Sequence, residues 1–63
     1  METTKFKQIV TEAIGHDFDD WEELTSIELV FVLNACNQEL GKEKSIFDLI
    51  EVKTLKESCD LFV

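Results

Sequence analysis

Two adjacent hydroxyl side chains, Thr25 and Ser26, stand where an acidic segment of the chain gives way to an apolar one. The segment before them, Asp19–Leu24, reads DDWEEL, and the apolar stretch after them continues to Gly41. Thr25 and Glu28 have the spacing of a capping box, so this pair is expected to start a helix. A serine hydroxyl exposed at that point could carry a covalent group, or it could simply cap the helix.

The other reactive side chains do not form a catalytic set. His16 is the single histidine, and no nucleophile lies at a recognised motif spacing from it. The acids of segment 17–23 are typical of a solvated loop, and the absence of a mid-loop glycine excludes an EF-hand. Cys36 and Cys59 have no CxxC spacing and fall on predicted apolar faces, as small core residues do in a reducing compartment. We therefore expect neither an enzyme nor a metal site.

Size and charge limit what the chain can bind. Its 63 residues suffice for one small domain, 1–63. The net charge of −8 would repel a nucleic-acid backbone and would favour partners with basic patches. No apolar run is long enough for a membrane span, and the segment Met1–Gln8 is too polar for a signal peptide. These features predict a cytoplasmic protein that is monomeric when free and binds neither nucleic acid nor membrane.

The apolar pattern predicts an all-α fold with three main helices and one short helix. Apolar residues repeat at helical spacing over Thr4–Ile14, and this stripe predicts the first helix. Thr3 or Thr4 is expected to be its N-cap. Gly15 is expected to end it.

The middle of the chain predicts a loop followed by the longest helix. Phe18 and Trp21 are too large to remain solvated, so they should fold over the core and hold the loop in place. A single turn is expected over Asp20–Leu24, and a helix over Ser26–Leu40 that ends at Gly41.

The last third of the chain predicts two further helices. Ser45 should cap the short one, and Thr54 with Glu57 forms another capping box before the last one. Because the connections are short, the helices should pack as a small up-and-down bundle.

The helix expected over Ser26–Leu40 is apolar on two sides. Ile27, Phe31 and Ala35 follow one another at intervals of four, opposite the stripe that contains Val32 and Cys36. A chain of this length has too few residues to cover both sides. Ile27 and Phe31 are therefore expected to form an exposed ridge that binds a partner.

These features resemble the phosphopantetheine-dependent carrier proteins, the acyl and peptidyl carriers of biosynthesis. Their motif is Asp-Ser-Leu at the start of the second helix, where this chain has Thr25-Ser26-Ile27. The segment DDWEEL resembles the loop that precedes this motif in peptidyl carriers. Family members place apolar residues four, seven, ten and fourteen positions after the serine, and the corresponding residues here are Val30, Leu33, Cys36 and Leu40. The resemblance covers the whole chain and is strongest from Asp19 onward.

The resemblance implies a small free-standing carrier protein that is acted on by enzymes. A 4′-phosphopantetheine arm on Ser26 would hold an acyl or aminoacyl group as a thioester. Its partners would be a phosphopantetheinyl transferase and the enzymes that load or transfer the acyl or aminoacyl group, with basic or apolar docking patches. The residues expected to dock are Thr25, Ile27, Glu28, Phe31 and Phe47.

Three departures from the family pattern leave alternatives open. Thr25 replaces the motif aspartate, the Gly-Gly pair before the motif is missing, and the loop after Gly15 is several residues short. A second register aligns the segment 27–30 with a common family sequence and puts Glu23 at the position of the modified serine. The chain could then be an unmodified docking or regulatory subunit of a biosynthetic enzyme. A third hypothesis is an unrelated acidic helical module that inhibits a basic protein.

Overall fold

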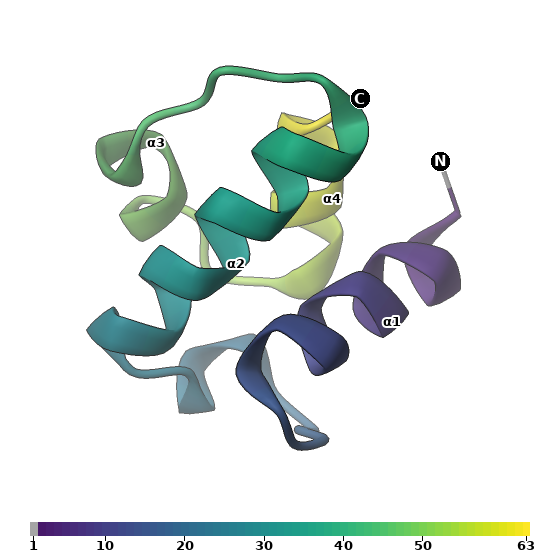
Figure 1. Ribbon diagram of the computed structural model, residues 1–63. Helices are drawn as coiled ribbons and strands as arrows, with labels where there is room; N and C mark the ends of the chain where they lie inside the picture. Colours follow the sequence, from purple (N-terminus) through teal and green to yellow (C-terminus); the bar gives the residue numbers. More distant parts are fainter. Residues whose placement is uncertain (1) are drawn as a thin grey trace.

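The computed structural model describes residues 2–63 and shows an all-α fold with no strand in that range (Figure 1). Four α-helices and one 3-10 turn follow one another in the predicted order. The helices are α1 (Thr3–Ile14), α2 (Ser26–Leu40), α3 (Ile46–Ile50) and α4 (Leu55–Leu61), and the 3-10 turn covers Trp21–Glu23. The expected three main helices and one short helix are confirmed.

The start of α1 differs from the prediction. Neither Thr3 nor Thr4 is the N-cap, because Glu2 holds that position with an extended backbone and no side-chain hydrogen bond. The Glu2 carbonyl accepts the first helical hydrogen bond from the Phe6 N–H at 3.1 Å, so both threonines lie inside the helix. The helix ends as predicted at Gly15, whose φ of 83° lies in the left-handed region that favours glycine.

An aromatic cluster forms the centre of the core and holds the loop between α1 and α2. The Phe6 ring lies 6.4 Å from the Trp21 ring and 5.9 Å from the Phe62 ring, measured between centroids. Phe18 meets Trp21 edge-on at 6.3 Å. All four rings are buried, which confirms that Phe18 and Trp21 fold down over the core.

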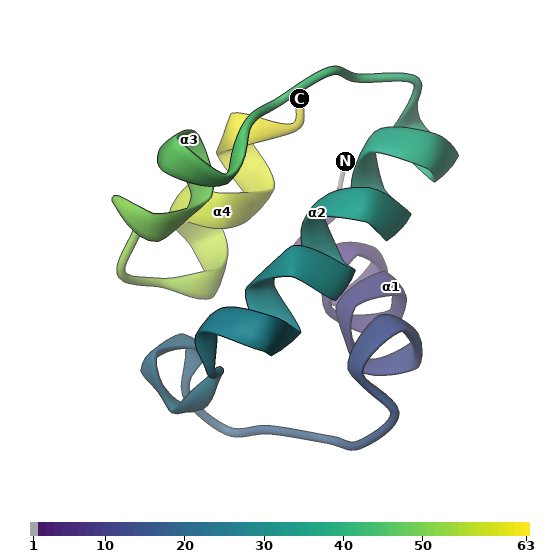
Figure 2. The same cartoon turned by 60° about the vertical axis from the view of Figure 1, so that its left-hand side comes forward.

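The helices pack as a compact ring around this cluster, with extents of 25 × 23 × 19 Å. Helix α2 packs against α1 on one side and against α3 on the other, and α4 packs against α1 and α3 (Figure 2). In α4 the Ser58 hydroxyl oxygen is buried with no hydrogen-bond partner among residues 2–63. The arrangement leaves one long side of α2 and the outer side of α3 without a covering element.

Candidate functional site

The loop before α2 is fixed by the first of two successive capping boxes. Oε2 of Glu23 accepts hydrogen bonds from the backbone N–H of Asp20 at 2.7 Å and of Asp19 at 3.1 Å. The Asp20 carboxylate in turn accepts from the Glu22 N–H at 3.2 Å. The Glu23 carboxylate therefore has a local structural role, in which it satisfies N–H groups that would otherwise lack partners.

The second capping box starts α2 itself. Oγ1 of Thr25 accepts from the Glu28 N–H at 3.2 Å, and Oε1 of Glu28 accepts from the Thr25 N–H at 2.9 Å. Ser26 is the first helical residue and is exposed. Thr25 provides the cap, so the Ser26 side chain is not used for capping, a point that the sequence left open.

His16, which the sequence indicated only as a surface loop residue, makes a contact that links two elements. Its Nδ1 lies 2.8 Å from the Asp17 carbonyl oxygen, and its Nε2 hydrogen-bonds to Oε2 of Glu28. Glu28 thus bonds to Thr25 through one carboxylate oxygen and to His16 through the other. The twelve-residue separation of His16 and Glu28 explains why no local pattern in the sequence indicated this pair.

The pKa values of both His16 and Glu28 are shifted by these contacts. The hydrogen bond to the Asp17 carbonyl and then the bond to Glu28 raise the pKa of His16 above its usual 6.5. The hydrogen bond from the Thr25 backbone and then the bond from His16 lower the pKa of Glu28 below its usual 4.5. In each residue the charged form is therefore the one that the contacts favour.

The predicted apolar ridge on α2 is exposed. Ile27 is 68% exposed and Phe31 50%, while Phe47 on the neighbouring α3 is 72% exposed. Val30 is exposed as well, at 43%, although the sequence pattern placed it with the apolar residues of the inward side, and Ile50 is 54% exposed. The five side chains lie on two helices that pack against each other, and no lysine or arginine occurs between Gln8 and Gly41. The exposed apolar side chains of the α2–α3 pair thus lie next to or within a segment that contains acids but no lysine or arginine.

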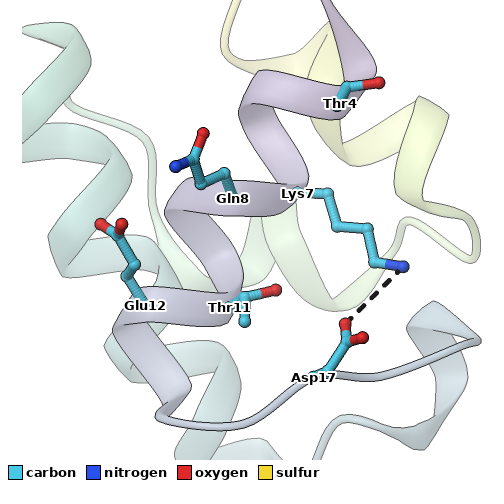
Figure 3. Close-up of a pocket in the computed structure, with 6 residues that line it drawn as sticks. All are labelled: Thr4, Lys7, Gln8, Thr11, Glu12 and Asp17. Carbon is cyan, nitrogen blue, oxygen red and sulfur yellow. Dashed lines mark ion pairs between the residues drawn. The ribbon is translucent and has the colours of Figure 1, made fainter.

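A shallow hollow on α1 lies apart from these residues. Six side chains line it: Thr4, Lys7, Gln8, Thr11, Glu12 and Asp17. Figure 3 shows that Gln8 and Glu12 project from one side of α1 and Lys7 from the other, so their polar groups do not converge. The Lys7 ammonium instead pairs with Asp17 at 3.8 Å and lies 5.2 Å from the centroid of the Phe18 ring. We assign this hollow no binding role.

The two cysteines, which the sequence placed on apolar faces, lie in the core. Cys36 and Cys59 are buried as predicted, and desolvation raises the pKa of the Cys36 thiol to about 12. Within the described part of the chain, no three histidine, cysteine or acidic side chains are placed to share a metal ion. None of the helices in residues 2–63 is both long and apolar enough to cross a membrane.

Comparisons with known proteins return no relative. No family model matches the chain, and no curated protein or solved structure is significantly similar to it.

Proposed function

We propose that this chain is a small carrier protein that holds an acyl or aminoacyl group as a thioester on a 4′-phosphopantetheine arm at Ser26. The observation that carries the proposal is the position of Ser26, which is exposed at the first residue of α2, directly after a well-ordered loop. A rigid, accessible hydroxyl is what a modifying enzyme requires of its target. The order of one long helix, a loop, a second long helix, a short helix and a last helix agrees with the resemblance on which the proposal rests.

Burial along α2 favours the register at Ser26 over the register at Glu23. Seven, ten and fourteen residues after Ser26 stand two partly buried leucines and the fully buried Cys36. The same spacings from Glu23 reach the partly buried Leu33 but also Val30, which is 43% exposed, and Asn37, whose amide is bonded to the Lys44 backbone. The spacing of four reaches a core residue in neither register, because Val30 after Ser26 and Ile27 after Glu23 are both exposed.

The local electrostatics at Ser26 suit a phosphodiester. In the first turn of α2 the Glu28 N–H is capped by Thr25, so the N–H groups of Ser26 and Ile27 remain for a ligand, and the helix dipole places positive potential at this end. A phosphodiester on Ser26 would lie at that end of α2. Ser26 itself need not be nucleophilic, because the transferase would activate its hydroxyl.

The exposed apolar surface is the docking surface in this proposal. Ile27, Phe31 and Phe47 would contact apolar patches on the transferase and on the enzymes that load or transfer the acyl group. Thr25 and Glu28 would contribute polar contacts, and basic patches on the partners would complement the acidic segment. The buried thiols agree with a reducing, cytoplasmic setting.

A second candidate is an unmodified docking or regulatory subunit with the same surface. It is favoured by Thr25, which occupies the place of the motif aspartate and is engaged as the helix cap. In that case the α2–α3 surface would bind the partner and Ser26 would carry nothing.

Intact-protein mass distinguishes the two candidates. The chain is incubated with coenzyme A and a broad-specificity phosphopantetheinyl transferase, alongside Ser26→Ala and, as the matched control, Ser45→Ala. Ser45 is also exposed and directly precedes a helix, so it reports any non-specific modification. The proposal predicts a gain of one arm in the wild type and in Ser45→Ala, and none in Ser26→Ala. No gain with several transferases, or a gain that persists in Ser26→Ala, would contradict it.

A further inference from the structure

We propose that His16 and Glu28 form a protonation-controlled clasp that fastens the loop after α1 to the start of α2. The clasp is a short chain of hydrogen bonds from the Asp17 carbonyl through the His16 ring to the Glu28 carboxylate and on to the Thr25 N–H. It adds a polar link between the loop and α2, beside the direct packing of α1 against α2. The inference holds whether or not Ser26 is modified.

The two carboxylates that face the imidazole favour its protonated form. From α2 it faces Glu28, and from its own loop it faces Asp17. Lys7 of α1 is paired with the Asp17 carboxylate at 3.8 Å, which partly offsets the charge of that carboxylate. Titration of Glu28 belongs to a lower pH range because its bonds lower its pKa, so the histidine is the switching group near neutral pH.

The two ring contacts cannot both persist when the imidazole is neutral. Both of its nitrogens face oxygen acceptors, and only the imidazolium carries two N–H donors. A neutral ring that keeps its Nδ1–H bond to Asp17 directs a lone pair at the Glu28 carboxylate, and the opposite tautomer directs one at the carbonyl. Loss of the proton therefore breaks one link of the clasp.

The segment that this loss releases is short. Phe18 and Trp21 are buried in the aromatic cluster and stay anchored at either pH. Gly15 has a positive φ and stands at the end of α1, where it can act as the hinge. Opening is therefore confined to residues 15–17, and it frees the Glu28 oxygen that faces His16 to bind a solvent ion or a partner's basic group.

His16 is the single histidine, so its ring signals can be followed by NMR without ambiguity. The wild type is titrated beside Glu28→Gln, which keeps a residue that can complete the capping box. Glu39→Gln, at the other glutamate of α2, is the charge-matched control. The proposal predicts a midpoint above 6.5 in the wild type and in Glu39→Gln, and a midpoint moved down towards 6.5 in Glu28→Gln.

Backbone 15N relaxation then shows whether protonation controls the loop. In the wild type, residues 16 and 17 should be rigid at about pH 5.5 and mobile at about pH 8.5, while residues 18–21 stay rigid at both. His16→Gln should give the mobile loop at both pH values. A midpoint unaffected by Glu28→Gln, or a loop equally rigid at both pH values, would overturn the proposal.

Discussion

At the scale of single residues, several side chains at the start of α2 are already committed to internal contacts, and Ser26 is not. Thr25 caps the helix, Glu23 caps the preceding turn, and the Glu28 side chain is only 18% exposed with both oxygens bonded. A basic group on a partner would have to compete with His16 for Glu28. Ser26 and Ile27 are therefore the more accessible positions of this segment.

The two classes of phenylalanine should respond differently to truncation. Phe31→Ala removes a half-exposed ring and should lower the free energy of unfolding by less than about 1 kcal/mol. Phe62→Ala, the control, empties a site that is 1% exposed and should cost about 3–5 kcal/mol, enough to unfold a domain of this size. Urea unfolding monitored by circular dichroism measures both. A loss of several kcal/mol for Phe31→Ala would show that it is a core residue and remove the docking ridge.

Replacing Ser58 should raise the free energy of unfolding, whereas the phenylalanine truncations lower it. Its hydroxyl is buried without a partner among the described residues, and burying such a group costs about 1–3 kcal/mol. Ser58→Ala should therefore raise the free energy of unfolding by about 1 kcal/mol, helped by the higher helix propensity of alanine. The exposed Ser26→Ala, with its cap intact at Thr25, serves as the comparison and should change stability little. Destabilisation by Ser58→Ala would mean that the hydroxyl has a hydrogen-bond partner in solution.

At the scale of elements, the sequence was sufficient to predict where a helix begins or ends wherever the local residue types set that boundary. Gly15 and Gly41 end helices through left-handed backbones, and the boxes at Asp20 and Thr25 begin the elements that the spacing predicted. The predicted N-cap of α1 was wrong because nothing in the local sequence distinguishes the Glu2 carbonyl, which accepts the first helical hydrogen bond, from the carbonyls of the two threonines. The His16–Glu28 pair could not be predicted, since it depends on how α1 and α2 are docked.

That pair should make stability depend on pH in a defined window. The raised pKa of His16 contributes stability that is complete below 6.5 and is lost as pH rises through the folded-state pKa. The lowered pKa of Glu28 contributes stability that is complete above 4.5 and is lost as pH falls through its folded-state value. The combined contribution is therefore largest between 4.5 and 6.5.

Urea unfolding of the wild type and His16→Gln at several pH values measures this contribution, because charge effects elsewhere cancel in the difference. We expect the free energy of unfolding of the wild type to exceed that of His16→Gln at about pH 5.5, and the two values to converge by about pH 8.5. A difference that is constant across this range, or that grows with pH, would contradict the assigned contacts.

At the scale of the whole molecule, charge is the dominant feature. The chain carries −8 overall, and the segment from Gln8 to Gly41 contains acids but no lysine or arginine. The burial of Phe6, Trp21 and Phe62 provides the opposing stabilisation. The all-α architecture was predictable from the sequence because helical periodicity and caps agree along the chain. The exposure of Val30 and Ile50 was not, because it depends on which sides of α2 and α3 the rest of the chain covers.

Salt should stabilise this protein. Raising NaCl from about 20 to about 300 mM screens the repulsion among the acids and should add roughly 1 kcal/mol, or about 4–8 °C in Tm. The double variant Asp19→Asn with Glu22→Gln changes the net charge from −8 to −6 and should show a smaller effect. Thermal unfolding followed by circular dichroism measures both. A Tm that falls with salt would indicate that the His16–Glu28 and Lys7–Asp17 pairs outweigh the repulsion.

The most direct test of the account is the mass of the chain as isolated from the cells that naturally make it. If the chain functions as a carrier, part of it should be isolated in a form that is heavier by one phosphopantetheine arm. Tandem mass spectrometry should place the arm on Ser26, and a further acyl or aminoacyl increment should be released by hydroxylamine. A chain found only at its unmodified mass would contradict the carrier function. It would favour the unmodified docking protein with the exposed surface of α2 and α3 as its binding site.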